Sequence, residues 1–210
     1  MGSGEAQRVI AALEAGQPVL LPTDTVYGLA TSAQREDYAT RVYRLKGREA
    51  TQPTALLAPS IEVLFDCLPE LDASARTIVR ALLPGPYTLI LPNPARRFRW
   101  LTGVRTDAIG VRVPVLPEAV QGVVDAVGCL MATSANDPGG PNPVSLDDVP
   151  QRIREAVAAE LDLAALPLEL AAEELCDLRI DLCKPRRFQL LERLLRHCHL
   201  EIVTVGSEVR

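Results

Sequence analysis

Short apolar segments alternate with helical segments along most of the chain, and this alternation limits the possible folds more than any other feature. We expect strands over residues 18–22, 54–58, 87–91, 109–113 and 129–132. Apolar side chains recur every three or four positions, as they do in helices, over residues 5–15, 38–46, 72–83 and 147–161. A chain that alternates in this way forms a sheet with crossover connections. The sequence therefore predicts an α/β fold.

The length and the distribution of residue types indicate one domain. At 210 residues the chain is long enough for one substantial domain, and no repeat or low-complexity segment divides it. The composition changes near residue 162, beyond which lie both histidines, three of the five cysteines and a dense pattern of leucine and arginine. We therefore expect a domain core over residues 5–161, and an atypical C-terminal segment over residues 162–210 that packs on the same domain.

The cysteines and the N-terminus indicate the compartment. An odd number of cysteines with no CxxC pair is typical of reduced thiols in the cytosol. The N-terminus lacks the basic start and apolar run of a signal peptide, and no apolar window approaches the length of a membrane span. His197-Cys198-His199 does not have the spacing of a zinc site. We expect a cytoplasmic protein with no membrane span and no bound metal of its own.

The charge and the scarcity of aromatic residues limit the partners. Aromatic side chains make up 4% of the chain, which argues against a platform that stacks the bases of single-stranded RNA. The net charge is −5, yet residues 35–48, 96–112 and 184–196 each hold five basic side chains and at most two acidic ones. These segments form an anion site if they converge, and are solvated faces if they do not.

Familiar catalytic motifs are missing, and short polar clusters remain. The chain has no GxSxG, no HExxH and no Walker A loop. Polar clusters lie at the ends of predicted elements over residues 22–29, 46–48, 84–88, 111–114 and 133–136. Each one alone is better explained as a turn or a helix cap. Because ligands of α/β sheets bind at strand ends, five such clusters together indicate a binding site.

Those five clusters resemble the motifs of one family. PTDTVYGL, LKGR, PGPYTLIL, IGVRVP and TSAN occur in this order, and the match covers about residues 5–161. The sequence is similar to the YrdC family, whose enzyme members are threonylcarbamoyl-AMP synthases. The resemblance implies a single-domain, twisted mixed sheet with flanking helices around a concave basic cavity. It also implies a nucleotidyltransferase that joins L-threonine, bicarbonate and ATP into threonylcarbamoyl-adenylate and releases pyrophosphate.

The resemblance assigns roles to particular residues. L-threonine would be bound by Thr25, Ser134 and Thr23. ATP would be bound, with Mg²⁺ on its phosphates, by Lys46, Arg48, Thr88, Arg112 and Asn136. Lys46 and Arg48 would be the catalytic pair. The product would pass to the complex that transfers threonylcarbamoyl to adenosine 37 of tRNA, so tRNA or double-stranded RNA is a further expected partner.

Two departures from the family pattern leave an alternative open. Gln52 and Leu57 stand where many members have Asn and His. The family's closing C-terminal strand has only an echo over residues 179–182. A non-catalytic RNA-binding protein would instead use the basic concave surface, with phosphate contacts from Arg96, Arg97, Arg99 and Arg105. A carbamoyl-transfer module, as in larger hydrogenase-maturation proteins, would need acylphosphatase and zinc-finger segments that this sequence lacks.

Overall fold

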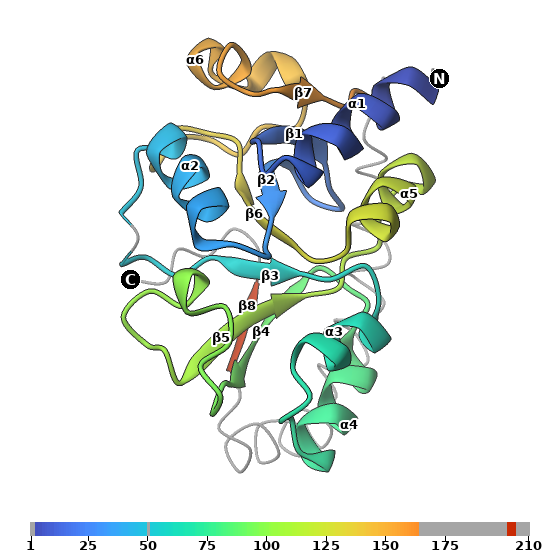
Figure 1. The fold of residues 1–210 in the computed structure, drawn as a ribbon, viewed down its shortest axis with the longest axis vertical. Helices are drawn as coiled ribbons and strands as arrows, with labels where there is room; N and C mark the ends of the chain where they lie inside the picture. The colour runs from blue at the N-terminus through green and yellow to red at the C-terminus, as the bar shows by residue number, and fades with distance from the viewer. Residues whose placement is uncertain (1–2, 50, 164–200, 205–210) are drawn as a thin grey trace.

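The computed structural model describes residues 3–49, 51–163 and 201–204, in which eight strands form one sheet. The strands are β1 (Val19–Pro22), β2 (Tyr27–Ser32), β3 (Ala55–Leu57), β4 (Tyr87–Pro92), β5 (Ala108–Arg112), β6 (Leu130–Ser134), β7 (Ala159–Glu160) and β8 (Glu201–Thr204). The α-helices are α1 (Ser3–Glu14), α2 (Glu36–Lys46), α3 (Ile61–Cys67), α4 (Ala73–Leu82), α5 (Glu118–Val127) and α6 (Gln151–Arg154). Figure 1 shows their arrangement.

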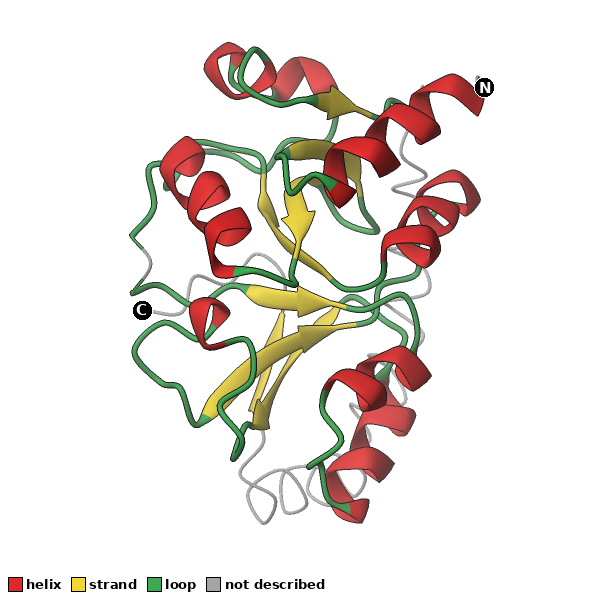
Figure 2. Ribbon diagram, viewed as in Figure 1, coloured by secondary structure: helices red, strands yellow, loops and turns green. Residues whose placement is uncertain are grey.

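The sheet is mixed and strongly twisted. Its strand order is β7-β1-β2-β6-β3-β5-β4-β8. The β1–β7 and β3–β5 pairs are parallel, and the other neighbours are antiparallel. In Figure 2 the strands turn from nearly vertical in β2 to nearly horizontal in β3, which is the usual twist accumulated over several strands. The predicted α/β fold is confirmed.

Each face of the sheet has its own apolar core. On one face α2, α3 and α4 pack on strand residues that include Leu29, Leu56 and Val111. On the opposite face α1 and α5 pack on strand residues that include Leu57 and Leu130. Burying each such leucine or valine stabilises the fold by about 1.5–3 kcal/mol relative to leaving it in water. The two cores fix the sheet from both sides.

On the face of the sheet where α1 and α5 pack, the small residues Ala55, Gly110 and Ala132 form a half-buried strip. Ala132 on β6 pairs with Ala55 on β3, and a Cβ on Gly110 of β5 would lie 3.8 Å from the Cα of Ala55. Side chains two positions apart on a strand share a face. Ser134 and Arg112 therefore lie on this same face, at the ends of β6 and β5.

Most predicted elements are present, and several others were not predicted. The observed β1, β3, β4, β5 and β6 match the expected strands within about two residues. The elements β2, α3, α5 and β8 lie where no element was predicted, and β7 lies inside a predicted helix. β2 has the sequence YGLATS, whose small and polar residues hide its position between β1 and β6 at full burial.

The expected helix over residues 147–161 is wrong. The chain instead forms a 3₁₀ turn over Leu146–Asp148, the short helix α6 and the edge strand β7. Pro150 has an extended backbone and separates the two helical pieces. Backbone bonds then join residues 158–161 to β1, from Ala158 to Pro18 and from Leu161 to Leu20. The unpaired edge of β1 therefore determines the structure of this segment.

The end of the chain contributes one strand to the sheet. Residues 201–204 form β8, which pairs antiparallel with β4 at the edge of the sheet. Residues 164–200 and 205–210, with the His197–His199 segment and the 179–182 echo, lie outside the described residues. The division at residue 162 stays a prediction. Across the described ranges, no helix is both long and apolar enough to cross a bilayer.

Candidate active site

The amine of Lys46 is surrounded by oxygen atoms at the C-terminal end of β6. Its Nζ donates hydrogen bonds to the main-chain oxygens of Ser134 at 2.6 Å and of Asn136 at 2.5 Å. It also contacts the amide oxygen Oδ1 of Asn136. The residue is only 5% exposed. Burial, with a smaller contribution from the charge of Arg48, lowers the pKa of Lys46 to about 8.

The turn that Lys46 holds has a fixed orientation. Ser134 Oγ donates to Asn136 Oδ1 at 2.6 Å, and Asn136 Nδ2 donates to the main-chain oxygen of Gly140 at 2.6 Å. The amide oxygen of Asn136 therefore faces two donors and its nitrogen faces an acceptor. The main chain of Ala135 is bonded to Tyr27 on β2. These hydrogen bonds fix residues 134–136, called here the hydroxyl-amide turn, beside the amine of Lys46.

Gly47 turns the chain so that Arg48 reaches the same strand end. Gly47 caps α2 in the left-handed conformation, at φ 67°, where its N–H bonds back to residues 43 and 44. Arg48 then donates to Thr133 Oγ1 at 3.3 Å and to Gln52 Oε1 at 2.9 Å. Burial lowers the pKa of Arg48. The lysine and the arginine of LKGR thus contact adjacent residues of β6.

A buried ion pair links the first motif to the fourth. Arg112 Nη2 donates to Asp24 Oδ1 at 2.8 Å, and the two side chains are 14% and 8% exposed. Burial raises the pKa of Asp24, although the charge of Arg112 and the bond from it act in the opposite direction. Asp24 was not among the predicted site residues. Its place in PTDTVYGL, next to two threonines, was the only available signal.

The two threonines of that loop are used differently. Thr23 Oγ1 donates to the main-chain oxygen of Val26 at 2.7 Å and accepts from the N–H groups of Thr25 and Val26. The hydroxyl of Thr23 therefore closes the turn. The hydroxyl of Thr25 is buried and has no hydrogen-bond partner in the described structure. Thr25 is thus the threonine with unused hydrogen-bonding capacity.

Thr88 lies beside the strip of small residues. It is half-buried on β4, and its methyl carbon would be 3.4 Å from a Cβ placed on Gly110. Because Gly110 has no side chain, nothing from β5 projects from the sheet at this point beside Thr88. Thr88 and Arg112 come from the neighbouring antiparallel strands β4 and β5.

The structure thus brings the predicted residues together in three contact groups. The first group joins Lys46 to Ser134 and Asn136, and the second joins Arg48 to β6 through Thr133. The third joins Arg112 to the loop that carries Thr25. These groups lie at the ends of β6 and β5. The roles of the individual residues toward substrates stay predictions.

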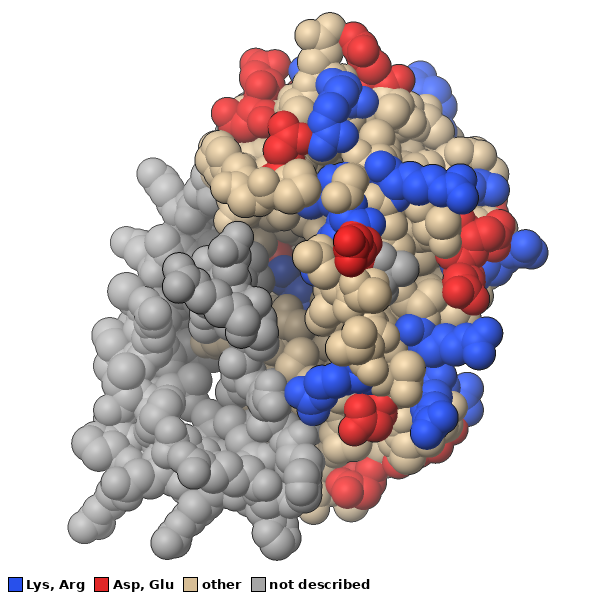
Figure 3. All heavy atoms as spheres, turned by 90° about the vertical axis from the view of Figure 1, so that its left-hand side faces the viewer, with Lys and Arg blue, Asp and Glu red and all other residues tan. Residues whose placement is uncertain are grey.

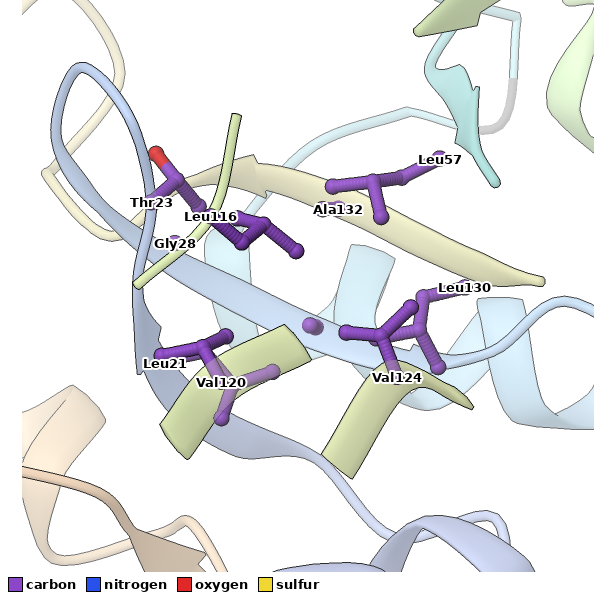
Figure 4. A pocket seen from close by; sticks show the side chains of 10 residues that line it. Leu21, Thr23, Gly28, Leu57, Leu116, Val120, Val124, Leu130 and Ala132 are labelled. Carbon is purple, nitrogen blue, oxygen red and sulfur yellow. The ribbon is translucent and has the colours of Figure 1, made fainter. Parts of the chain in front are cut away.

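Gln52 and Leu57, which together make the first departure from the family pattern, have different surroundings in the structure. Gln52 orients Arg48 by accepting its Nε–H. Leu57 is 5% exposed and lines a small apolar pocket between α5 and strands β1, β2 and β6 (Figure 4). Thr23 and Gly28 line one end of that pocket, and Ala132 lies beside Leu57. The histidine that many members have is therefore replaced by a side chain that fills an apolar layer.

The arginines proposed for RNA contact are partly engaged with carboxylates. Arg97 forms a two-pronged ion pair with Glu70, with distances of 2.6–3.0 Å. Arg99 lies 3.9 Å from Glu36. In Figure 3 basic and acidic side chains are interspersed over the face shown. For Arg97 and Arg99 this arrangement favours the interpretation as a solvated face.

A mixed α/β sheet, with a lysine and an arginine that contact the end of β6, is the arrangement in which we expect a site for small anionic ligands. The sequence model of the Sua5/YciO/YrdC family, described as "Telomere recombination", matches residues 11–169. The chain belongs to the Sua5/YciO/YrdC family. The predicted family is thereby confirmed.

Individual relatives agree with this assignment. A putative threonylcarbamoyl-AMP synthase of Mycobacterium tuberculosis is 30% identical over 153 residues, 73% of this chain and 70% of that protein. The threonylcarbamoyl-AMP synthase of Vibrio parahaemolyticus is 34% identical over 161 residues, 74% and 84% of the two chains. These relatives are named as enzymes, as the sequence predicted for this chain.

A solved structure shows the same fold with an amino acid bound. The crystal structure of Pyrococcus abyssi Sua5 complexed with L-threonine superimposes with a TM-score of 0.66 at 30% sequence identity. The match covers 75% of this chain and 47% of the archaeal protein. This chain therefore spans less than half of the length of that relative.

Proposed function

We propose that this protein synthesises L-threonylcarbamoyladenylate from L-threonine, bicarbonate and ATP, with release of pyrophosphate. The observation that carries the proposal is that the basic pair contacts the C-terminal end of β6, where Lys46 bonds to Ser134 and Asn136 and Arg48 bonds to Thr133. The names of the relatives and the threonine complex of P. abyssi Sua5 support the choice of substrates.

The proposed reaction has two steps that balance without a protein nucleophile. The amine of L-threonine and bicarbonate give a carbamate and water. An oxygen of the carbamate then attacks the α-phosphorus of ATP, and pyrophosphate leaves. Both nucleophile and leaving group belong to substrates, so the protein's task is to position them and to compensate their charge.

The positive side chains offset the repulsion between the two anionic substrates. Two unit negative charges about 4 Å apart repel by about 4 kcal/mol at an effective dielectric constant of about 20. A carbamate and a triphosphate must approach this closely. Lys46, Arg48 and Arg112 supply the compensating charge in the proposal, and Mg²⁺ arrives on the phosphates as part of the nucleotide substrate. The guanidinium groups suit two-pronged contacts with phosphate or carboxylate.

The remaining predicted residues complete the proposed site. Thr25 and Ser134 offer hydroxyl groups to L-threonine, and Thr23 shapes the loop that presents Thr25. Thr88 and Asn136 contribute to the ATP side. The product would serve N6-threonylcarbamoyladenosine formation at position 37 of tRNA, through the threonylcarbamoyl-transfer complex in the cytoplasm.

Pyrophosphate release tests this proposal. The chain is incubated with ATP, Mg²⁺ and bicarbonate, with and without L-threonine. Release that requires both L-threonine and bicarbonate is expected. Lys46→Ala and Arg48→Ala should each abolish it, whereas Arg44→Ala, on an exposed side chain of the same helix, should not. Unchanged release in both site variants would remove the basic pair from the mechanism.

A further inference from the structure

Three buried polar atoms around the Asp24–Arg112 ion pair have no hydrogen-bond partner in the described part of the chain. They are Asp24 Oδ2, Arg112 Nε and Thr25 Oγ1. Asp24 Oδ1 and Arg112 Nη2 are already bonded to each other at 2.8 Å, so two of the three unpaired atoms belong to side chains in direct contact. Leaving such atoms unpaired costs about 1–3 kcal/mol each. Two of these atoms lie on one buried ion pair, and the Thr25 hydroxyl is close enough to Asp24 to lower the pKa of its carboxylate, so together they indicate a site that a polar ligand completes.

The kinds of atom define what would complete it. A carboxylate oxygen accepts only, so Asp24 Oδ2 needs a donor, and the strongest donors to it carry positive charge. Arg112 Nε donates only, so it needs an acceptor, best an anionic oxygen. The hydroxyl of Thr25 can do either. The complementary ligand has a cationic donor and an anionic acceptor close together.

We propose that Asp24 binds the α-ammonium group of the amino-acid substrate. This inference rests on the proposed function and deepens it. An α-amino acid is a zwitterion whose ammonium and carboxylate are attached to one carbon, which matches neighbouring acceptor and donor atoms. The carbamate of the proposed reaction forms on this same nitrogen, so its negative oxygens are made beside Arg112.

Asp24 has the properties that this role needs. Its ion pair with Arg112 fixes the carboxylate and leaves one oxygen for the ligand. The raised pKa of Asp24 makes its carboxylate a better proton acceptor than an exposed one, and the ammonium must lose a proton before it can form a carbamate.

Calorimetric titration with two ligands tests the proposal. One ligand is L-threonine, and the other is (R)-3-hydroxybutanoate, which keeps the hydroxyl, methyl and carboxylate groups but lacks the amine. The wild-type chain should bind L-threonine at least about tenfold more tightly than the analogue, because a charge-assisted bond is lost with the amine. Asp24→Asn should weaken L-threonine binding by a similar factor but should not weaken binding of the analogue, because Arg112 then meets the analogue's carboxylate without a charged partner of its own.

Two further variants separate binding from folding. Asp24→Glu keeps the charge that pairs with Arg112 but moves the carboxylate oxygen that would contact the ligand. It should therefore also weaken the binding of L-threonine and not that of the analogue. Asp37→Asn changes an exposed carboxylate that pairs with Arg35, and it should change the affinity for neither ligand.

The possible failures are distinguishable. A wild-type chain that binds both ligands equally, or an Asp24→Asn variant that weakens both by the same factor, would overturn the assignment of Asp24 alone. A wild-type chain that binds no L-threonine would overturn the proposed function together with this assignment.

Discussion

The amine of Lys46 lies 2.6 Å from the main-chain oxygen of Ser134, although 88 positions separate the two residues in the chain. This contact joins the C-terminal end of α2 to the C-terminal end of β6. Lys46 is therefore both one of the positive charges of the proposed site and the residue that holds the hydroxyl-amide turn. The predictions below follow from this arrangement and from the neighbouring ion pair.

The buried amine should make stability depend on pH. The pKa of Lys46 is about 8 in the folded chain, against 10.5 for an ordinary lysine, so the unfolded chain binds the proton more tightly between these values. Stability must therefore rise with pH across that interval. The unfolding free energy of wild type minus that of Lys46→Met should increase by about 2 kcal/mol from about pH 8 to about pH 10. Urea denaturation measures both, and a flat or falling difference would contradict the burial argument.

Gly47 should be intolerant of a side chain for conformational reasons alone. A Cβ at Gly47 meets nothing within 4 Å, but its φ of 67° lies in the left-handed region. Gly47→Ala should lower the unfolding free energy by about 1–2 kcal/mol and reduce pyrophosphate release by moving Arg48 relative to Lys46.

Gly122→Ala is the matched control for this prediction. Gly122 lies inside α5, has no atom near its Cβ position and has an ordinary φ. Its replacement should raise stability by about 0.5–1 kcal/mol. Equal effects of the two substitutions would argue against a special role for the left-handed turn.

Removing one member of the Asp24–Arg112 pair should cost more than removing both. Asp24→Ala leaves the guanidinium buried without its partner, which typically costs about 3–5 kcal/mol. The double variant Asp24→Ala, Arg112→Leu should recover a large part of that loss. Urea unfolding of the two variants checks this, and a double variant less stable than the single one would show that the pair does not behave as a unit.

Salt should separate the synthase from an RNA-binding protein. A protein that neutralises several phosphates loses affinity steeply between about 50 and about 200 mM salt, whereas L-threonine affinity should change by no more than about twofold. The variant Arg97→Ala, Arg99→Ala should keep full pyrophosphate release, since both arginines lie near carboxylates. Loss of release in that variant, with a steep salt dependence, would favour the RNA-binding alternative.

The sequence predicted the parts of the site that are local and missed the part that depends on the fold. Each motif could be placed at the end of an element because turn residues and apolar periodicity act over a few positions. The Asp24–Arg112 contact joins residues 88 positions apart, and no local pattern encodes it. The family resemblance named Thr25 and Arg112, but it did not show that the residue before Thr25 is bound to Arg112.

The two kinds of fold error have related causes. β2 was missed because its glycine, alanine, threonine and serine look like a loop, and its burial comes from neighbours on both sides. The false helix over residues 147–161 came from Val149, Ile153 and Val157, which recur at helical spacing. These side chains do pack on the core, but Pro150 and pairing with β1 determine the backbone. In both cases tertiary contacts override local preference.

The most direct test of the proposed synthesis follows the carbon of bicarbonate. The chain is incubated with ATP, Mg²⁺, L-threonine and either ordinary or carbon-13 bicarbonate, and the adenylate product is examined by mass spectrometry. Threonylcarbamoyl-adenylate that gains the mass of one carbon-13 from labelled bicarbonate, and that is absent with Lys46→Ala, is the predicted result. A folded wild-type chain that forms no such adenylate, or forms one without the label, would contradict it.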